Sequence, residues 1–132
     1  MLPLISLDDR IDLVISTDPA IDIKKGDREP CHALPKSKCK IKAKQTPLVI
    51  QIRPLSSRES LRLFSTVEED HTGVVMRACE LCVTAITGEG ISASNPETIE
   101  NTLDRIPFQV LGAVGSFIIT ESIQTEDPTR AA

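Results

Sequence analysis

The hydrophobic pattern of this sequence changes period once, near residue 55, and that change limits the class of fold that the chain can adopt. Before it, apolar and polar residues alternate, as on a β-strand with one buried face. After it, apolar residues recur every three or four positions, as on the buried side of α-helices. Strands followed by helices predict an α+β domain.

Three segments carry the alternating pattern and predict strands at about 11–16, 37–44 and 48–53. In the first, Ile11, Leu13 and Ile15 share one side. The second has a lysine at every even position from 36 to 44, which is typical of a protected sheet edge. A three-residue link, 45–47, joins it to the third and predicts a hairpin. We therefore expect a small antiparallel sheet of two or three strands.

Four helices are predicted to pack with this sheet, at 57–69, 72–87, 96–104 and 107–124. The first begins with Ser56 and Glu59 at the spacing of a capping box, and it is expected to bury Leu61, Phe64 and Val67. The third begins at Asn95-Pro96, a cap followed by a favoured first-turn proline. The second carries an apolar stripe, whose members are Val75, Cys79, Cys82 and Ile86.

A length of 132 residues suits one domain. We expect residues 1–124 to form it, with a long charged loop at 17–35 and a flexible tail at 125–132. The longest apolar stretch is shorter than the roughly 20 residues that span a bilayer, so no membrane contact is expected. No export signal opens the sequence, which favours reduced cytosolic thiols.

The four cysteines raise the question of a metal site. Zinc is held by four Cys or His side chains, delivered as closely spaced pairs on turns. Cys31 and Cys39 are too far apart for such a pair, and Cys79 and Cys82 lie in the apolar stripe. Core packing is therefore favoured, and no metal or cofactor is predicted. Whether the loop with Cys31 and Cys39 meets Cys79 and Cys82 stays open.

The sequence offers no constellation that predicts catalysis. Gly88-Glu89-Gly90 lacks the third glycine of a dinucleotide fingerprint, since position 93 is Ala, and no Gly-Lys-Ser/Thr follows a strand. The carboxylates are scattered over helix exteriors. The residues alone therefore predict a small mixed domain that binds something, with no catalytic residue to name.

The charge of the chain is unevenly distributed. Residues 24–44 hold eight Lys or Arg and two acidic residues, a net charge of +6. The whole chain has a net charge of −4, so the residues outside this segment carry −10. Such a basic element suits an acidic partner, or the acidic face of a second copy of the chain. Aromatic residues for base stacking are few, which weighs against nucleic acid. The predicted electrostatic contacts are Lys38, Lys40, Lys42 and Lys44.

The last predicted helix, 107–124, is apolar most of the way round. A helix of this kind is central to its domain or packs on something outside it. Gly112 and Gly115 would let another helix approach closely, from within the domain or from a partner. The residues predicted to contact a client or a second copy are Phe108, Leu111, Val114, Phe117 and Ile118.

The order of segments resembles the small tail assembly chaperones of long-tailed bacteriophages. The likeness covers about residues 11–120 and includes TPLVIQIRPLSSRESLRLF, then VVMRACELCVTAITGEGIS, a loop and an apolar closing helix. Arg53, Pro54, Leu55 and Glu59 stand at the expected places. The lysine-rich strand and the Cys31–Cys39 loop depart from the family pattern.

The resemblance implies an assembly factor in the host cytoplasm, and not an enzyme, that binds the tape measure protein and helps tail tube subunits collect around it. A compact domain with an apolar helical surface is compatible with this role, since it can cover client helices and self-associate along them. Two other interpretations of the sequence stay open. One is a structural subunit of the virion, in the tail or connector, and the other is a zinc-stabilised adaptor that binds nucleic acid.

Overall fold

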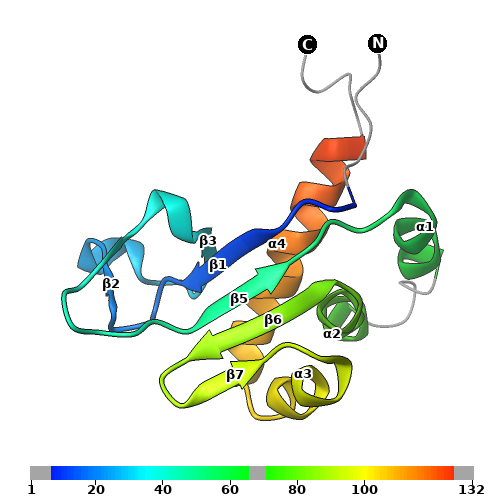
Figure 1. Cartoon of the computed structure of the whole chain (residues 1–132). Helices are drawn as coiled ribbons and strands as arrows, with labels where there is room; N and C mark the ends of the chain where they lie inside the picture. The colour runs from blue at the N-terminus through cyan, green and yellow to red at the C-terminus, as the bar shows by residue number, and fades with distance from the viewer. Residues whose placement is uncertain (1–6, 66–70, 127–132) are drawn as a thin grey trace.

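The computed structural model of the chain describes residues 7–65 and 71–126, and within them it confirms the α+β class (Figure 1). The strands are β1 (Ile11–Ile15), β2 (Ile21–Asp22), β3 (Ala33–Pro35), β4 (Lys40–Ile41), β5 (Val49–Ile52), β6 (Val83–Gly88) and β7 (Ile91–Ala93). The helices are α1 (Ser57–Ser65), α2 (His71–Cys82), α3 (Pro96–Leu103) and α4 (Phe108–Glu126), with two short 3-10 turns, η1 (Lys25–Asp27) and η2 (Lys36–Lys38).

The main sheet has five antiparallel strands in the order β3-β1-β5-β6-β7, more than the two or three predicted. Its register places Leu13 opposite Ile50, Ile50 opposite Ile86, and Ile86 opposite Ala93. This row is almost fully buried, in one core cluster with apolar residues of α2, α3 and α4. In Figure 1, α4 passes behind the sheet and crosses its strands.

Helices α2 and α4 pack unusually close together at Gly115. A Cβ atom added to Gly115 would lie 2.5 Å from Val75 Cγ1 and 2.6 Å from the Val75 carbonyl oxygen. The backbones can approach to this degree only because position 115 has no side chain. The sequence-based expectation that a glycine admits a neighbouring helix is therefore confirmed at Gly115, within the domain.

The opposite face of the sheet is polar at its centre. Gln51 Nε2 donates to Asp12 Oδ1 over 3.2 Å, and Thr84 Oγ1 donates to Gln51 Oε1 over 3.0 Å. A sheet with one buried face and one hydrated face accounts for the alternation seen in the sequence of β5.

The predicted hairpin between 37–44 and 48–53 is wrong. Residues 36–38 form η2, and only Lys40–Ile41 is a strand, which pairs with β2. Both sides of β5 are occupied, by β1 and by β6. The inward positions of the predicted lysine strand were Ser37, Cys39, Ile41 and Ala43, which supply one large apolar side chain, too little to compete with β1 and β6 for β5.

The predicted helix 72–87 is too long. α2 ends at Cys82, and residues 83–88 form β6, which pairs with β5 and β7. Val83, Thr84, Ile86 and Thr87 are β-branched, which favours a strand. The apolar stripe is nevertheless buried throughout, since Val75, Cys79 and Cys82 reach the core from α2 and Ile86 reaches it from β6.

The other helix predictions agree with the structure where it describes them. α3 and α4 are confirmed, and Asn95 caps α3 by accepting from the Thr98 N–H over 3.0 Å. α1 is described to Ser65, so residues 66–69 and Val67 lie outside the described residues, as does the Phe64 side chain. Leu61 was expected in the core but is 71% exposed, and Leu63 is buried in its place.

The segment 17–35, predicted to be a long loop, contains β2, η1 and β3. β3 belongs to the main sheet, whereas residues 17–28 and 36–46 form a projection beside it, which we call the basic lobe (Figure 1, left). Arg28 organises it, because its guanidinium donates to the backbone carbonyls of Ser16, Asp18 and Ile21.

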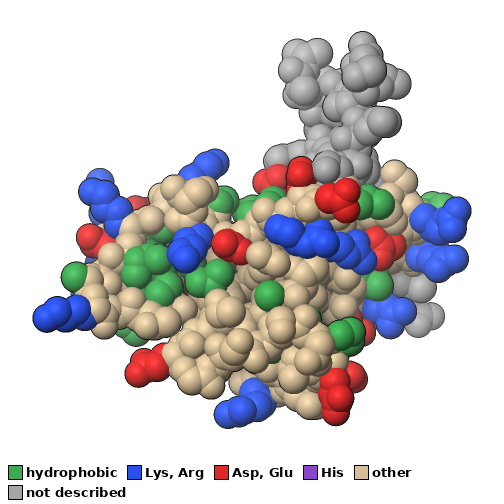
Figure 2. Space-filling model, viewed as in Figure 1, with side chains coloured by type: hydrophobic (Ala, Val, Ile, Leu, Met, Phe, Trp, Pro, Cys, Tyr) green, Lys and Arg blue, Asp and Glu red, His purple; other side chains and the backbone are tan. Residues whose placement is uncertain are grey.

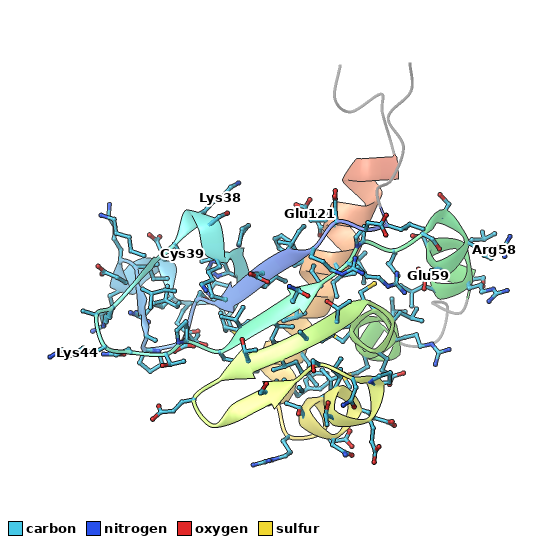
Figure 3. All side chains as sticks on the ribbon, viewed as in Figure 1. Lys38, Cys39, Lys44, Arg58, Glu59 and Glu121 are labelled. Atoms are coloured by element: carbon cyan, nitrogen blue, oxygen red, sulfur yellow. The ribbon has the colours of Figure 1, made fainter. Side chains whose placement is uncertain are left out.

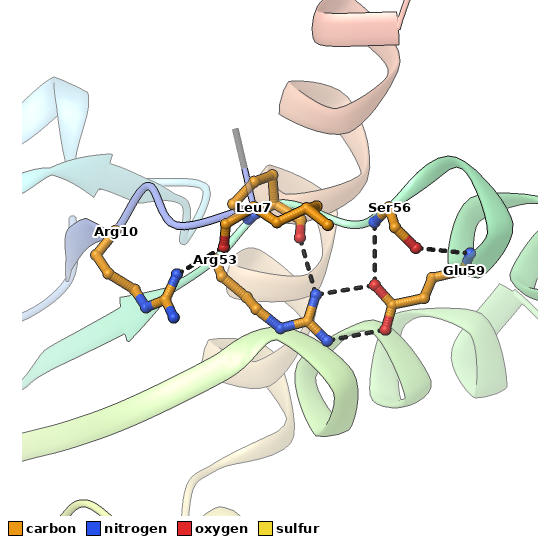
Figure 4. Close-up of polar contacts among 6 residues, drawn as sticks. Leu7, Arg10, Arg53, Ser56 and Glu59 are labelled. Atoms are coloured by element: carbon orange, nitrogen blue, oxygen red, sulfur yellow. Dashed lines mark hydrogen bonds and ion pairs between the residues drawn. The ribbon is translucent and has the colours of Figure 1, made fainter. Parts of the chain in front are cut away.

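A charged corner joins β5 to α1 (Figure 4). Arg53 donates two hydrogen bonds of 2.8 Å to the Glu59 carboxylate, and the Ser56 N–H donates to the same carboxylate over 3.0 Å. The Glu59 N–H donates to Ser56 Oγ over 3.1 Å, which completes the predicted capping box. The hydrogen bond from Arg53 is the main reason that the pKa of Glu59 is lowered to about 2.

Replacing Gly115 by Ala is expected to destabilise the fold by about 1–3 kcal/mol, because the added methyl group overlaps the backbone of Val75. Gly112 is a matched control on the same helix, since an added Cβ there meets nothing within 4 Å. Gly112→Ala should stabilise by about 0.5–1 kcal/mol through helix propensity. Urea unfolding of both variants measures this, and equal effects would contradict the packing described.

The charged corner should make stability depend on acid pH. Because the pKa of Glu59 falls from 4.5 to about 2 on folding, its stabilisation is complete above pH 4.5 and is lost as the pH falls toward 2. With a side chain 24% exposed, we expect a contribution on the order of 2 kcal/mol. Glu59→Gln should flatten the unfolding free energy over this range; an unchanged pH profile would contradict the assignment.

Candidate functional site

The predicted contact surface of α4 is divided by the fold. Leu111, Val114 and Ile118 are 4%, 0% and 1% exposed and belong to the core, so burial removes them from any surface that a client can reach. Phe108 is 57% exposed and Phe117 is partly buried. What remains for contact is therefore the side of α4 that faces away from the sheet.

That side of α4 forms one wall of a groove of about 650 Å³. Residues 29–33, which lead into β3, form the other wall, and Val75 of α2 also lines it. Phe108, Gly112, Ser116 and Thr120 follow one another along the α4 wall at intervals of four residues, so they lie on one face of the helix. Gly112 leaves this wall open, because no atom lies within 4 Å of an added Cβ.

The wall at 29–33 is held in place by a buried hydroxyl. Ser16 is fully buried. Its hydroxyl accepts a hydrogen bond of 3.0 Å from the His32 N–H and donates one of 2.9 Å to the Arg28 carbonyl. The Ser16 N–H donates to the His32 carbonyl over 2.9 Å. Cys31 Sγ lies 3.9 Å from the Gln109 carbonyl oxygen, which brings this wall against the start of α4. The groove is thus formed by two segments that lie almost 80 residues apart in the sequence.

The groove is apolar with acidic groups at its edge. Among the described residues that line it are Glu29 and Glu121, together with Phe108, Phe117 and Ala113, and they include no Lys or Arg. Figure 3 shows Glu121 on the upper part of α4 and Lys44 at the far left corner of the basic lobe, well apart in this view. Cys31 and His32 also line the groove. Such a surface suits a ligand held through apolar contact and charge.

The predicted lysine contacts lie elsewhere. Lys38, Lys40, Lys42 and Lys44 are exposed on the basic lobe, and none of them lines the groove. Figure 2 shows Lys and Arg side chains around the outer rim of the lobe and again over α1. Lys44 sits in a turn with φ of 64°. The structure therefore separates the two predicted contact regions instead of joining them.

The cysteines do not assemble into one site. Cys79 and Cys82 are fully buried, and burial is the main reason that the pKa of each thiol is raised to about 12. Cys31 lies against Thr17 and the start of α4. Within the described residues, no three His, Cys, Asp or Glu side chains gather as a metal would require. The zinc-binding alternative therefore finds no ligand set there.

Comparison of the chain with protein-family models, with curated proteins and with solved structures finds no match. In the part of the chain that the structure describes, none of the helices has the length and apolarity needed to cross a membrane. The site must therefore be interpreted from its own geometry.

The wall at 29–33 is the part of the site that sequence analysis missed. It lies within the segment 17–35, whose three prolines and many charges predict a long loop. The available signal was the alternation of Cys31 and Ala33 just before Pro35, which matches a short edge strand. The α4 wall was predicted, but its inward and outward faces were not separated.

The thiols should differ sharply in reactivity. Only the thiolate attacks a disulfide reagent, and a pKa of about 12 leaves Cys79 and Cys82 protonated at pH 8. We expect the partly exposed Cys31 and Cys39 to react with Ellman's reagent in the native protein, and all four thiols to react in denaturant. A Cys31→Ser, Cys39→Ser double variant is the control, and rapid native reaction in it would contradict the burial.

Proposed function

We propose that the chain is a tail assembly chaperone of a long-tailed bacteriophage, acting in the host cytoplasm. In this role it covers an apolar segment of the tape measure protein until tail tube subunits collect around that protein. The observation that carries the proposal is the apolar groove along α4, with the Phe108 ring 57% exposed beside it. An exposed aromatic side chain next to an apolar hollow is a feature of protein-binding surfaces.

The groups with shifted pKa support binding over catalysis. The pKa values of Arg53 and Glu59 are shifted mainly by the hydrogen bonds between these two side chains. The pKa values of Cys39, Cys79 and Cys82 are raised mainly by burial. Each shift has a structural cause, and none of these residues is among those described as lining the groove. Active sites usually place such shifted groups inside the cleft. The proposed role needs only reversible contact with an aggregation-prone client.

Co-expression with the tape measure protein from the same source tests the proposal. The wild-type chain should raise the soluble yield of the tape measure protein and co-purify with it. Phe108→Asp should abolish both effects without unfolding the chain, because the ring is already largely exposed. Leu61→Asp is the matched control, since Leu61 is an equally apolar, 71% exposed residue on α1.

Two results would count against the proposal. If the wild-type chain does not co-purify with the tape measure protein, the proposed chaperone function is contradicted. Recovery of the chain as a stoichiometric component of purified particles would favour the virion-subunit alternative, since a chaperone leaves when assembly is complete.

A further inference from the structure

The basic lobe is a folded unit that carries an exposed set of lysines. Ile21 is fully buried in it, and the Lys42 N–H donates to the Ala20 carbonyl over 2.8 Å. The guanidinium of Arg28 is bound to backbone carbonyls within and beside the lobe. All seven lysines are exposed, and within the part of the chain that the structure describes none of them forms an ion pair. They are Lys24, Lys25, Lys36, Lys38, Lys40, Lys42 and Lys44.

The positive charge of the lobe is not balanced locally. Residues 17–28 and 36–46 hold eight Lys or Arg and three Asp, a net charge of +5. One of these carboxylates, on Asp18, accepts from the N–H groups of Ala20 and Leu48 over 2.9 Å each. Glu89 lines a hollow together with Lys44, but the structure shows no ion pair between them. Like charges held close together repel one another, so the lobe attracts an acidic surface.

Nucleic acid is a poor match for the lobe. The lobe contains no aromatic residue on which a base would stack. The guanidinium of its one arginine, Arg28, is occupied by carbonyls, so no planar fork is left to bind a phosphate. The whole chain has a net charge of −4, so the residues outside the lobe carry −9, which repels a polyanion. A protein surface with a few exposed carboxylates is the better partner.

A surface of this kind is present on the chain itself, along α3. Three exposed carboxylates, spaced by three and four residues, lie on one side of this helix, while Ile99 and Leu103 are buried on the other. We call this side the acidic face, and its members are Glu97, Glu100 and Asp104. Within the described residues none of the three forms an ion pair. Arg105 is the one cation in 96–105, which leaves a net charge of −2.

The lobe and the acidic face do not meet within one copy of the chain. The structure shows no ion pair between the described residues of the lobe and of α3. In Figure 1 the lobe lies on the left, beyond the ends of β1 and β5, whereas α3 lies at the bottom, where it packs on β6 and β7. Figure 3 places Lys44 at the outermost corner of the lobe, directed away from the sheet. Each copy therefore presents a basic and an acidic surface in different directions.

We propose that the chain associates with itself head to tail, through the lysine corner of one copy and the acidic face of the next. The lysine corner consists of Lys40, Lys42 and Lys44. It spans at most about 13 Å, and the acidic face rises by seven residues, about 10 Å, so the two rows match in length. A neighbour on one surface leaves the other surface free, and association continues beyond a dimer. The contact needs no client, so it is independent of the proposed function.

Charge reversal on each surface tests the contact. The lobe variant is Lys42→Glu with Lys44→Glu, and the helix variant is Glu100→Lys with Asp104→Lys; all four positions are exposed. Association of the full chain is measured by analytical ultracentrifugation from roughly 10 µM to 1 mM protein in about 50 mM salt. The average mass of the wild-type chain should rise with concentration, and this rise should disappear in about 500 mM salt.

The two variants should fail alone and succeed together. Each alone presents two surfaces of like charge, so association should weaken at least about tenfold. An equimolar mixture should restore it, because each acidic surface then finds a basic one. Controls with the same change in net charge are Arg58→Glu with Arg77→Glu, and Asp9→Lys with Glu80→Lys, at exposed positions outside both surfaces. Both controls should associate like wild type, and thermal unfolding shows whether each variant is folded.

The outcomes that overturn the inference are distinct. A wild-type chain that stays monomeric in low salt removes the contact altogether, and so does a mixture of the two variants that fails to associate. Association that stops at a dimer overturns the head-to-tail arrangement. If the wild-type chain does not self-associate but binds a DNA duplex of about 20 base pairs, and the lobe variant does not, the lobe is a nucleic-acid surface instead.

Discussion

The close contact between α2 and α4 at Gly115 is the constraint on which the rest of the structure depends. With the Val75 carbonyl oxygen only 2.6 Å from where a Cβ would stand, Gly115 is the position of α4 that faces α2 at this contact. This orientation of α4 turns Leu111, Val114 and Ile118 into the core. It leaves Phe108, Gly112 and Phe117 on the outside, so the packing that completes the core also creates the groove.

The nearly uniform apolarity of α4 then has a physical explanation. One side completes the core under the sheet, and the other side lines the groove. A helix with a single buried face would carry a polar stripe on its outer side. Here the outer side carries the polar Gln109, Ser116 and Thr120, and beside them the Phe108 ring is 57% exposed. The proposed client contact relies on this ring, which stands next to the groove.

Sequence analysis predicted the class of fold, the caps of α1 and α3, and the extent of α4, because each of these depends on local chemistry. It missed the end of α2, where the helical stripe continues in register up to Ile86 although the chain has already become β6. The stripe could not reveal this, because Ile86 is buried in either conformation. The pairing of β5 with β6 decided it, and the local signal for a strand was the β-branched composition of residues 83–87.

The candidate site was likewise predicted only in part from the sequence. The apolarity of α4 pointed to a contact surface, but only the packing against Val75 distinguishes Phe108 and Phe117 from the buried Leu111, Val114 and Ile118. The lysine alternation was misassigned for a related reason, because period alone does not specify which strand will be the neighbour. The opposite wall of the groove depends on Ser16, which lies far from it in sequence.

The central claim is that a client contacts the outer side of α4. Phe108 and Phe117 both lie on α4, so fluorophenylalanine labelling places a ¹⁹F probe at each of them. On addition of a tape measure fragment, the resonances of Phe108 and Phe117 should shift. Binding of the fragment that shifts neither resonance would contradict the account.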